Sequence, residues 1–192
     1  MRKSFFGIAA AIILAIVPGV QPALAQGFAL DELRGGIFAH SVDRGGPDST
    51  FGLLDLNRIE DLNVELLFTT PDADLLRWIG SPRPHFGLTL NFGGLESMSY
   101  AGLTWTVPVF DTPFFIEGSF GAAVHNGGFS DLAAPRRNLG CTLHFRESVS
   151  LGYRFTPEAS VMLTAEHASH AGLCGPDNEG LTNLGVRFGY RF

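Results

Sequence analysis

The sequence predicts an all-β protein, an eight-stranded antiparallel transmembrane β-barrel, and three observations lead there. The chain holds 24 glycines and 17 phenylalanines in 192 residues, which favours tight turns and a large aromatic surface. Residues 182–192 alternate between a polar or small face and an apolar face that ends in Tyr190 and Phe192. The connections between strand-like stretches alternate between short and long. Together these are typical of a bacterial outer-membrane barrel.

The expected strands follow one another along the chain, each with the side-chain period of two that a half-buried strand requires. They cover residues 32–43, 61–70, 83–92, 100–110, 114–125, 142–155, 159–171 and 182–192. Residues 74–79, in the connection between the second and third strands, predict a short interfacial turn of helix. An eight-stranded barrel is filled by its own side chains, which argues against an open pore.

The lengths of the connections predict how the barrel is oriented. Residues 111–113 and 156–158 are short links, whereas residues 44–60, 126–141 and 172–181 are longer and rich in Gly, Asp and Asn. Outer-membrane barrels have short periplasmic turns and longer external loops. We therefore expect the short links and the C-terminus on the periplasmic side.

The N-terminus has the features of an export signal. Arg2 and Lys3 precede an apolar run at residues 5–17, and Ala23-Leu24-Ala25 forms an A-x-A cleavage site. We expect residues 1–25 to be a cleaved signal peptide and residues 26–192 to form one barrel domain. The apolar run is too short to cross a bilayer as a helix, so strands must do so. The expected location is the outer membrane of a Gram-negative cell.

Charge and motif content exclude several classes of partner. The formal charge is −6 and Lys3 is the only lysine, which argues against nucleic-acid binding. The chain has no phosphate-cradling glycine loop or cofactor motif, so we expect no cofactor. His125 and His144 lie on other expected strands, without metal-ligand spacing to the histidines near residue 170, so we expect no metal site.

Two cysteines stand at corresponding places in the expected barrel. Cys141 and Cys174 would both lie at the external ends of adjacent strands. In an oxidising compartment, a pair placed in this way can form a disulfide that joins two loops.

The seventh expected strand carries a histidine and a serine on its apolar face. His167 and Ser169 follow Val161, Leu163 and Ala165 on that face. The i, i+2 spacing puts both side chains on one side, where the imidazole can take a proton from the hydroxyl. Polar residues are also common at a membrane interface, so the pair alone does not establish catalysis.

The surrounding sequence adds a resemblance. Residues 121–127, 151–154, 166–171, 178–181 and 189–192 together resemble the lipid A 3-O-deacylase (acyloxyacyl hydrolase-like) family of outer-membrane barrels. The resemblance implies a serine esterase with lipid-facing catalytic groups. It would remove the ester-linked 3-hydroxyacyl chain at position 3 of lipid A, within lipopolysaccharide of the outer leaflet. It implies His167 as general base and Ser169 as nucleophile.

Two positions depart from the family pattern. His170 stands where the family has an asparagine proposed to help hold the oxyanion, which makes the His170 side chain, or backbone N–H groups near it, the oxyanion candidate. Thr182 stands at the position of the family's acidic residue and cannot hold an imidazolium by charge.

A carboxylate on the sixth expected strand offers a replacement acid. Glu147 interrupts an otherwise apolar outward face, and a carboxylate there is costly unless it has a partner or lies near the interface. A three-residue turn at residues 156–158 pairs Glu147 with His167, whereas the neighbouring register pairs it with Ala165. We hypothesise that Glu147 orients His167 as the acid of a triad. Glu179 is the second candidate, and an interfacial Glu147–arginine pair is the structural alternative.

Other readings stay open at this point. A non-catalytic eight-stranded barrel with a structural or surface-interaction role is favoured by His170 and Thr182. A periplasmic lipocalin-like carrier would turn its apolar faces inward around a ligand. The sequence leaves open whether the barrel forms a homodimer.

Overall fold

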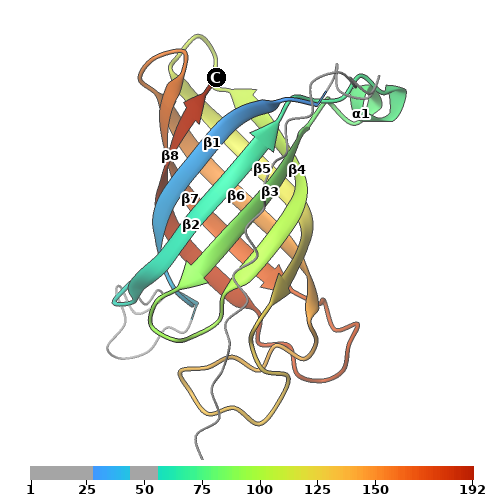
Figure 1. Cartoon of the computed structure of the whole chain (residues 1–192), viewed down its shortest axis with the longest axis vertical. Helices are drawn as coiled ribbons and strands as arrows, with labels where there is room; N and C mark the ends of the chain where they lie inside the picture. The colour runs from blue at the N-terminus through green and yellow to red at the C-terminus, as the bar shows by residue number, and fades with distance from the viewer. Residues whose placement is uncertain (1–27, 44–55) are drawn as a thin grey trace, which may run out of the picture.

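The computed structural model describes residues 28–43 and 56–192, so the expected signal peptide lies outside the described residues. Eight antiparallel strands form a closed barrel in which each strand pairs with its sequence neighbours and β8 closes on β1 (Figure 1). This confirms the predicted fold. The strands are β1 (Leu30–Ala39), β2 (Ile59–Phe68), β3 (Arg83–Asn91), β4 (Met98–Pro108), β5 (Phe114–His125), β6 (Leu143–Arg154), β7 (Ala159–Ser169) and β8 (Leu181–Arg191).

Strands β1, β4 and β7 end two to four residues before the predicted positions, and their backbones show why. Residues with positive φ, which L side chains rarely adopt, follow their ends: Ser41 after β1, Phe110 after β4 and Ala171 after β7. Such a residue turns the chain out of the extended conformation, so apolar alternation continues beyond the last ladder pair. The predicted first strand, residues 32–43, therefore loses residues 40–43 to the following loop.

The barrel is polar inside and apolar outside. On β6, His144, Arg146 and Ser150 point inward and are buried, whereas Leu143 and Val149 point outward and are exposed. Apolar side chains facing outward match a lipid surface. A lumen lined by charged groups does not suit an apolar ligand, which excludes the lipocalin-like alternative.

Paired charges fill the lumen. Arg34 contacts Glu65 at 3.2 Å and Glu117 at 2.7 Å, and all three side chains are buried. Arg146 Nη2 lies 2.6 Å from Glu166 Oε2, and both side chains are buried in the lumen. Buried charges are tolerated when each has a partner of opposite sign.

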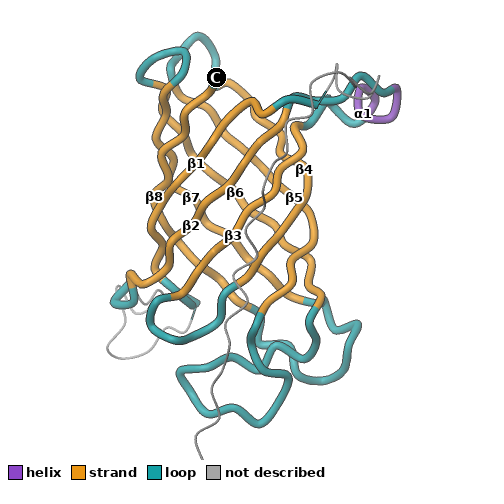
Figure 2. The backbone as a smooth tube through the Cα atoms, in the orientation of Figure 1, coloured by secondary structure: helices purple, strands orange, loops and turns teal. Residues whose placement is uncertain are grey.

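The two ends of the barrel differ (Figure 2). The C-terminus, the short turns after β4 and β6, and helix α1 (Asp74–Trp78) lie at one end, the turn end. The longer connections after β5 and β7 lie at the opposite end, the loop end. Helix α1 falls within the predicted helical turn at residues 74–79, and its Trp78 is largely exposed. No helix in the described part of the chain is long and apolar enough to cross a membrane.

Candidate active site

His167 and Ser169 lie together on the outer surface of the barrel, at the loop end. Their strand, β7, alternates regularly: both are partly exposed, while Glu166, Ala168 and His170 are buried toward the lumen. Ser169 is the last residue of β7. The predicted nucleophile and base therefore share one face of one strand, next to the apolar surface.

The His167 ring is held from β8. Its Nδ1 lies 2.8 Å from Thr182 Oγ1, and the two residues are partners in the β7–β8 ladder. The Thr182 hydroxyl in turn donates to Asp43 Oδ2 at 3.1 Å. Asp43 lies just beyond β1, on the far side of β8 from His167.

Glu147 takes its predicted place in the ladder but makes no bond there. The β6–β7 register pairs Glu147 with His167, as the length of the turn at residues 156–158 predicts. Glu147 is exposed on the outer face. Over residues 28–43 and 56–192, no hydrogen bond or ion pair joins it to His167 or to an arginine. The Nδ1 partner of His167 is Thr182 instead.

The second acid candidate, Glu179, holds two loops together. Its carboxylate accepts hydrogen bonds from the backbone N–H and the side-chain amide of Asn138, both at 3.2 Å. Its backbone N–H donates to Asn138 O at 3.0 Å. These contacts account for a structural role between the β5–β6 and β7–β8 loops.

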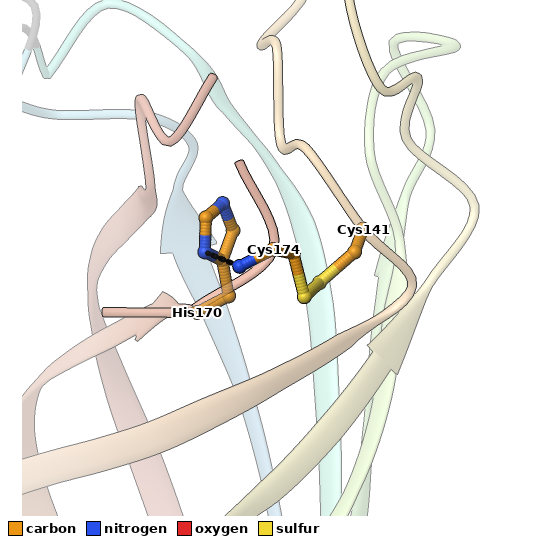
Figure 3. Close-up of side chains that lie close together, drawn as sticks. All are labelled: Cys141, His170 and Cys174. Carbon is orange, nitrogen blue, oxygen red and sulfur yellow. Dashed lines mark hydrogen bonds between the residues drawn. A yellow bond between two sulfur atoms is a disulfide. The ribbon is translucent and has the colours of Figure 1, made fainter. Parts of the chain in front are cut away.

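The His170 ring lies inside the loop end rather than beside Ser169. Its Nδ1 accepts a hydrogen bond from Cys174 N–H at 3.2 Å (Figure 3). Its Nε2 lies 2.7 Å from Asp177 O. The alternation of β7 continues for one residue past the strand, which sends this side chain inward and leaves it 2 % exposed. The outward twist that a His170 oxyanion donor would need is not present.

A disulfide joins Cys141 to Cys174, with 5.9 Å between their Cα atoms. It links the β5–β6 loop to the β7–β8 loop, and His170 lies beside it (Figure 3). Because the two sulfurs are bonded to each other, neither is the thiolate that binds metal ions. In this oxidised form the Cys141–Cys174 disulfide holds the two loops together.

Two residues that contact the candidate site, Gly180 and Asp43, have little or no signal in the sequence. Gly180 has φ +64° and packs on the His167 ring; its only sequence signal is the Asn178-x-Gly180 part of the family resemblance. The side chain of Asn178 accepts a hydrogen bond from His170 N–H at 3.2 Å. Asp43 has no signal, because its contact with Thr182 spans 139 residues.

The surface beside Ser169 is hollowed and apolar. Phe145, the ladder partner of Ser169, lines a cavity of about 170 Å³ at the loop end. The other lining residues are Ala122, Leu143, His144, His170, Leu173 and Cys174. A second apolar groove, of about 400 Å³, runs past Ala165 on the same outer face.

Comparison with known proteins gives one family and several similar folds. The family model described as lipid A 3-O-deacylase (PagL) matches residues 63–191, which include both His167 and Ser169. The lipid A deacylase PagL of Bordetella bronchiseptica (strain ATCC BAA-588 / NCTC 13252 / RB50) is 32% identical over 79 residues, 41% of this chain and 42% of that protein. The match thus spans less than half the length of that curated relative.

Solved structures share the architecture. The crystal structure of the outer membrane enzyme PagL has a TM-score of 0.57 at 18% identity, and covers 84% of this chain and 99% of that one. The N-terminal β-barrel domain of Pseudomonas aeruginosa OprF has a TM-score of 0.50 at 9% identity, with coverages of 85% and 98%. At these identities the likeness shows the fold alone. The family match extends from β2 to β8, and on that ground the chain belongs to the lipid A 3-O-deacylase (PagL) family of outer-membrane β-barrels.

Proposed function

We propose that this chain, as a mature barrel of residues 26–192, is an outer-membrane serine esterase. Its substrate is lipid A of lipopolysaccharide in the outer leaflet, and it removes the ester-linked 3-hydroxyacyl chain at position 3. One observation carries the proposal: His167 and Ser169 share the outward, lipid-side face of β7 within the matched family residues. A lipid ester can reach that face by lateral diffusion, without entering the filled lumen.

The His167–Thr182 contact supports the role of His167 as base. Thr182 donates its only hydroxyl proton to Asp43, so its oxygen accepts the proton of His167 Nδ1. The proton then sits on Nδ1, and Nε2 is left with a free lone pair. Nε2 is therefore the atom that takes the proton from Ser169.

The reaction follows the general course of a serine esterase. Ser169 Oγ attacks the ester carbonyl carbon while His167 Nε2 takes its proton. The tetrahedral intermediate collapses, the bond to the sugar oxygen breaks, and His167 returns the proton to that oxygen. A water molecule, deprotonated by His167, then attacks the acyl-enzyme carbonyl carbon. The bond to Ser169 Oγ breaks, His167 returns the proton to Ser169 Oγ, and the 3-hydroxy fatty acid leaves.

Stabilisation of the oxyanion falls to main-chain N–H groups that follow His170. Both ring nitrogens of His170 and its own backbone N–H already have partners at the loop end. Backbone N–H groups are effective oxyanion donors because they are fixed before the reaction begins. The apolar cavity at Phe145 is the proposed place for the acyl chain, since it borders the ladder partner of Ser169.

Mass spectrometry of lipid A tests this function. Cells would express the parent chain, Ser169→Ala, or Ser99→Ala, a matched control on the outer face of β4. We expect loss of one 3-hydroxyacyl group with the parent and with Ser99→Ala, and unchanged lipid A with Ser169→Ala. Unchanged lipid A with a correctly folded parent would favour the second candidate, a non-catalytic barrel. The observation that favours that candidate is Thr182 at the position of the family acid.

A further inference from the structure

We propose that Asp43 supplies the missing acid function of this site through the hydroxyl of Thr182. In this arrangement both are positioning residues for His167, and the carboxylate comes from the loop after β1 rather than from β8. The inference rests on the proposed esterase function and names the residues that prepare its base.

The hydrogen bonds from His167 to Thr182 and from Thr182 to Asp43 run in one direction. A carboxylate can only accept, so Thr182 must donate to Asp43 Oδ2 across their 3.1 Å contact. Thr182 Oγ1 is then the acceptor for His167 Nδ1–H at 2.8 Å. A hydroxyl without this carboxylate could instead donate to Nδ1, which would place the ring proton on Nε2 and remove the base. The carboxylate thus selects the productive tautomer of His167.

Arg137 holds the Asp43 carboxylate in place. Its other oxygen, Oδ1, pairs with the guanidinium of Arg137, which is 4 % exposed. Arg137 also donates to Ser41 Oγ at 2.7 Å and to Glu179 O at 3.2 Å. Each Asp43 oxygen therefore has a separate partner, and one of the two faces Thr182.

Hydrogen bonds of the backbone just before Asp43 position this residue beside β8. Val42 N–H donates to Thr182 O at 2.8 Å, and Ser41 N–H donates to Asn183 Oδ1 at 3.0 Å. These bonds continue the contact of the first strand with β8 beyond the end of the ladder. The pairing of β1 with β8, which closes the barrel, therefore positions the Asp43 carboxylate beside Thr182.

Glu147 flanks His167 from the opposite neighbour, β6. It is the ladder partner of His167, yet no described contact links the two side chains. The groups around the His167 ring are thus Glu147 on β6, Thr182 on β8, Asp43 with Arg137 behind it, and Gly180. Of the two carboxylates, Asp43 alone is connected to the ring by hydrogen bonds.

Two substitutions at Thr182 separate positioning from packing. Valine keeps the branched shape of threonine but lacks the hydroxyl, whereas serine keeps the hydroxyl and loses the methyl group. We expect Thr182→Val to lower kcat at least about 10-fold, since general-base catalysis contributes roughly 100-fold or more. Thr182→Ser should stay near the parent, and KM should change little in both. A purely structural role predicts the reverse order.

Substitutions of Asp43 in the parent chain give a second, independent test. We expect Asp43→Asn to lower kcat with little change in KM, whereas Asp131→Asn, an exposed charge removed elsewhere at the loop end, should act like the parent. Combining Asp43→Asn with Thr182→Val should cost little more than either change alone, because both break one chain of contacts.

The assay uses the full chain, refolded in detergent micelles, with purified lipid A as substrate. Gel mobility with and without heating reports whether each barrel is folded. An active parent with inactive Ser169→Ala, but with full kcat in folded Thr182→Val or Asp43→Asn, would overturn the Asp43–Thr182 inference alone. A folded but inactive parent would overturn the proposed function, and the positioning role with it.

Discussion

Gly180 lies directly against the imidazole ring of His167. A Cβ atom at residue 180 would be 2.7 Å from His167 Cε1 and 3.2 Å from Nε2. The contact is with the Cε1–Nε2 edge of the ring, next to the nitrogen that is proposed as the base, whereas Thr182 holds Nδ1. The position of His167 is therefore set by a hydrogen bond at Nδ1 and by the Gly180 backbone at the Cε1–Nε2 edge.

Gly180→Ala is expected to lower deacylase activity at least about 10-fold, because the ring must move from its place and small displacements of a catalytic group are costly. Gly172→Ala is the matched control. Gly172 has a similar positive φ of +76°, so an alanine there has similar backbone strain, but nothing lies within 4 Å of its added Cβ. Initial rates for the two folded variants give the comparison. Equal rates would show that the His167 contact does not matter.

Glu147→Gln is expected to reduce kcat less than Thr182→Val does. Glu147 faces His167 in the ladder without a hydrogen bond, so its charge acts only through space. An effect of about 1.4-fold to 5-fold corresponds to the 0.2–1 kcal/mol typical of an exposed pair. Glu158→Gln, an exposed carboxylate in the β6–β7 turn, serves as control. Full activity of Glu147→Gln would show that the charge of Glu147 does not act on His167.

His40 makes the stability of the loop end depend on pH. It follows β1 and is fully buried. Burial opposes its charge, but hydrogen bonds to Asp61 and Glu96, at 3.0 and 3.4 Å, outweigh burial and raise its pKa to about 9. A pKa raised above the ordinary value of 6.5 stabilises the fold fully below about pH 6.5, and this contribution is lost as the pH rises through 9.

The shift corresponds to about 3 kcal/mol at most. Urea unfolding of the refolded barrel at pH 6 and pH 9.5 measures it, and the parent should lose stability between these values. His40→Gln should be less stable at pH 6 and should show a smaller difference. The pKa of the Glu96 carboxyl is lowered despite burial, by its hydrogen bonds to His40 and to backbone N–H groups. The stability it contributes is therefore lost on acidification. A parent with the same stability at pH 6 and pH 9.5 would contradict the pairing of His40.

The disulfide is expected to stabilise both loops that border the site. It closes a segment with a sequence separation of 33, for which chain entropy gives about 3 to 4 kcal/mol at most. The double variant Cys141→Ala, Cys174→Ala should unfold at a lower urea concentration. It should also lose activity, because the β7–β8 loop carries Gly180. The parent assayed after reduction is the matched measurement. An unchanged midpoint in both would show that the loops are held by their hydrogen bonds alone.

Residue order alone predicts eight strands, the faces of their side chains and the β6–β7 pairing, but not where each strand ends. A strand's period of two is local, so the outward faces of β6 and β7 follow from residue order alone. A three-residue β6–β7 turn predicts the Glu147–His167 pair, which the ladder has, although the neighbouring register with Ala165 was open until the structure was known. The same alternation turns Glu166 inward, where the structure pairs it with Arg146.

The contacts that hold His167 come from the closed barrel and could not be predicted from residue order. Its ring partner Thr182 lies across a loop whose conformation no periodic pattern describes. Asp43 reaches Thr182 because the first and last strands pair, which brings together side chains 139 positions apart. The position of His170 likewise depends on where Ala171, at φ +53°, turns the chain out of β7. Strand faces are local properties of the chain, whereas contacts made by closing the barrel depend on all eight strands at once.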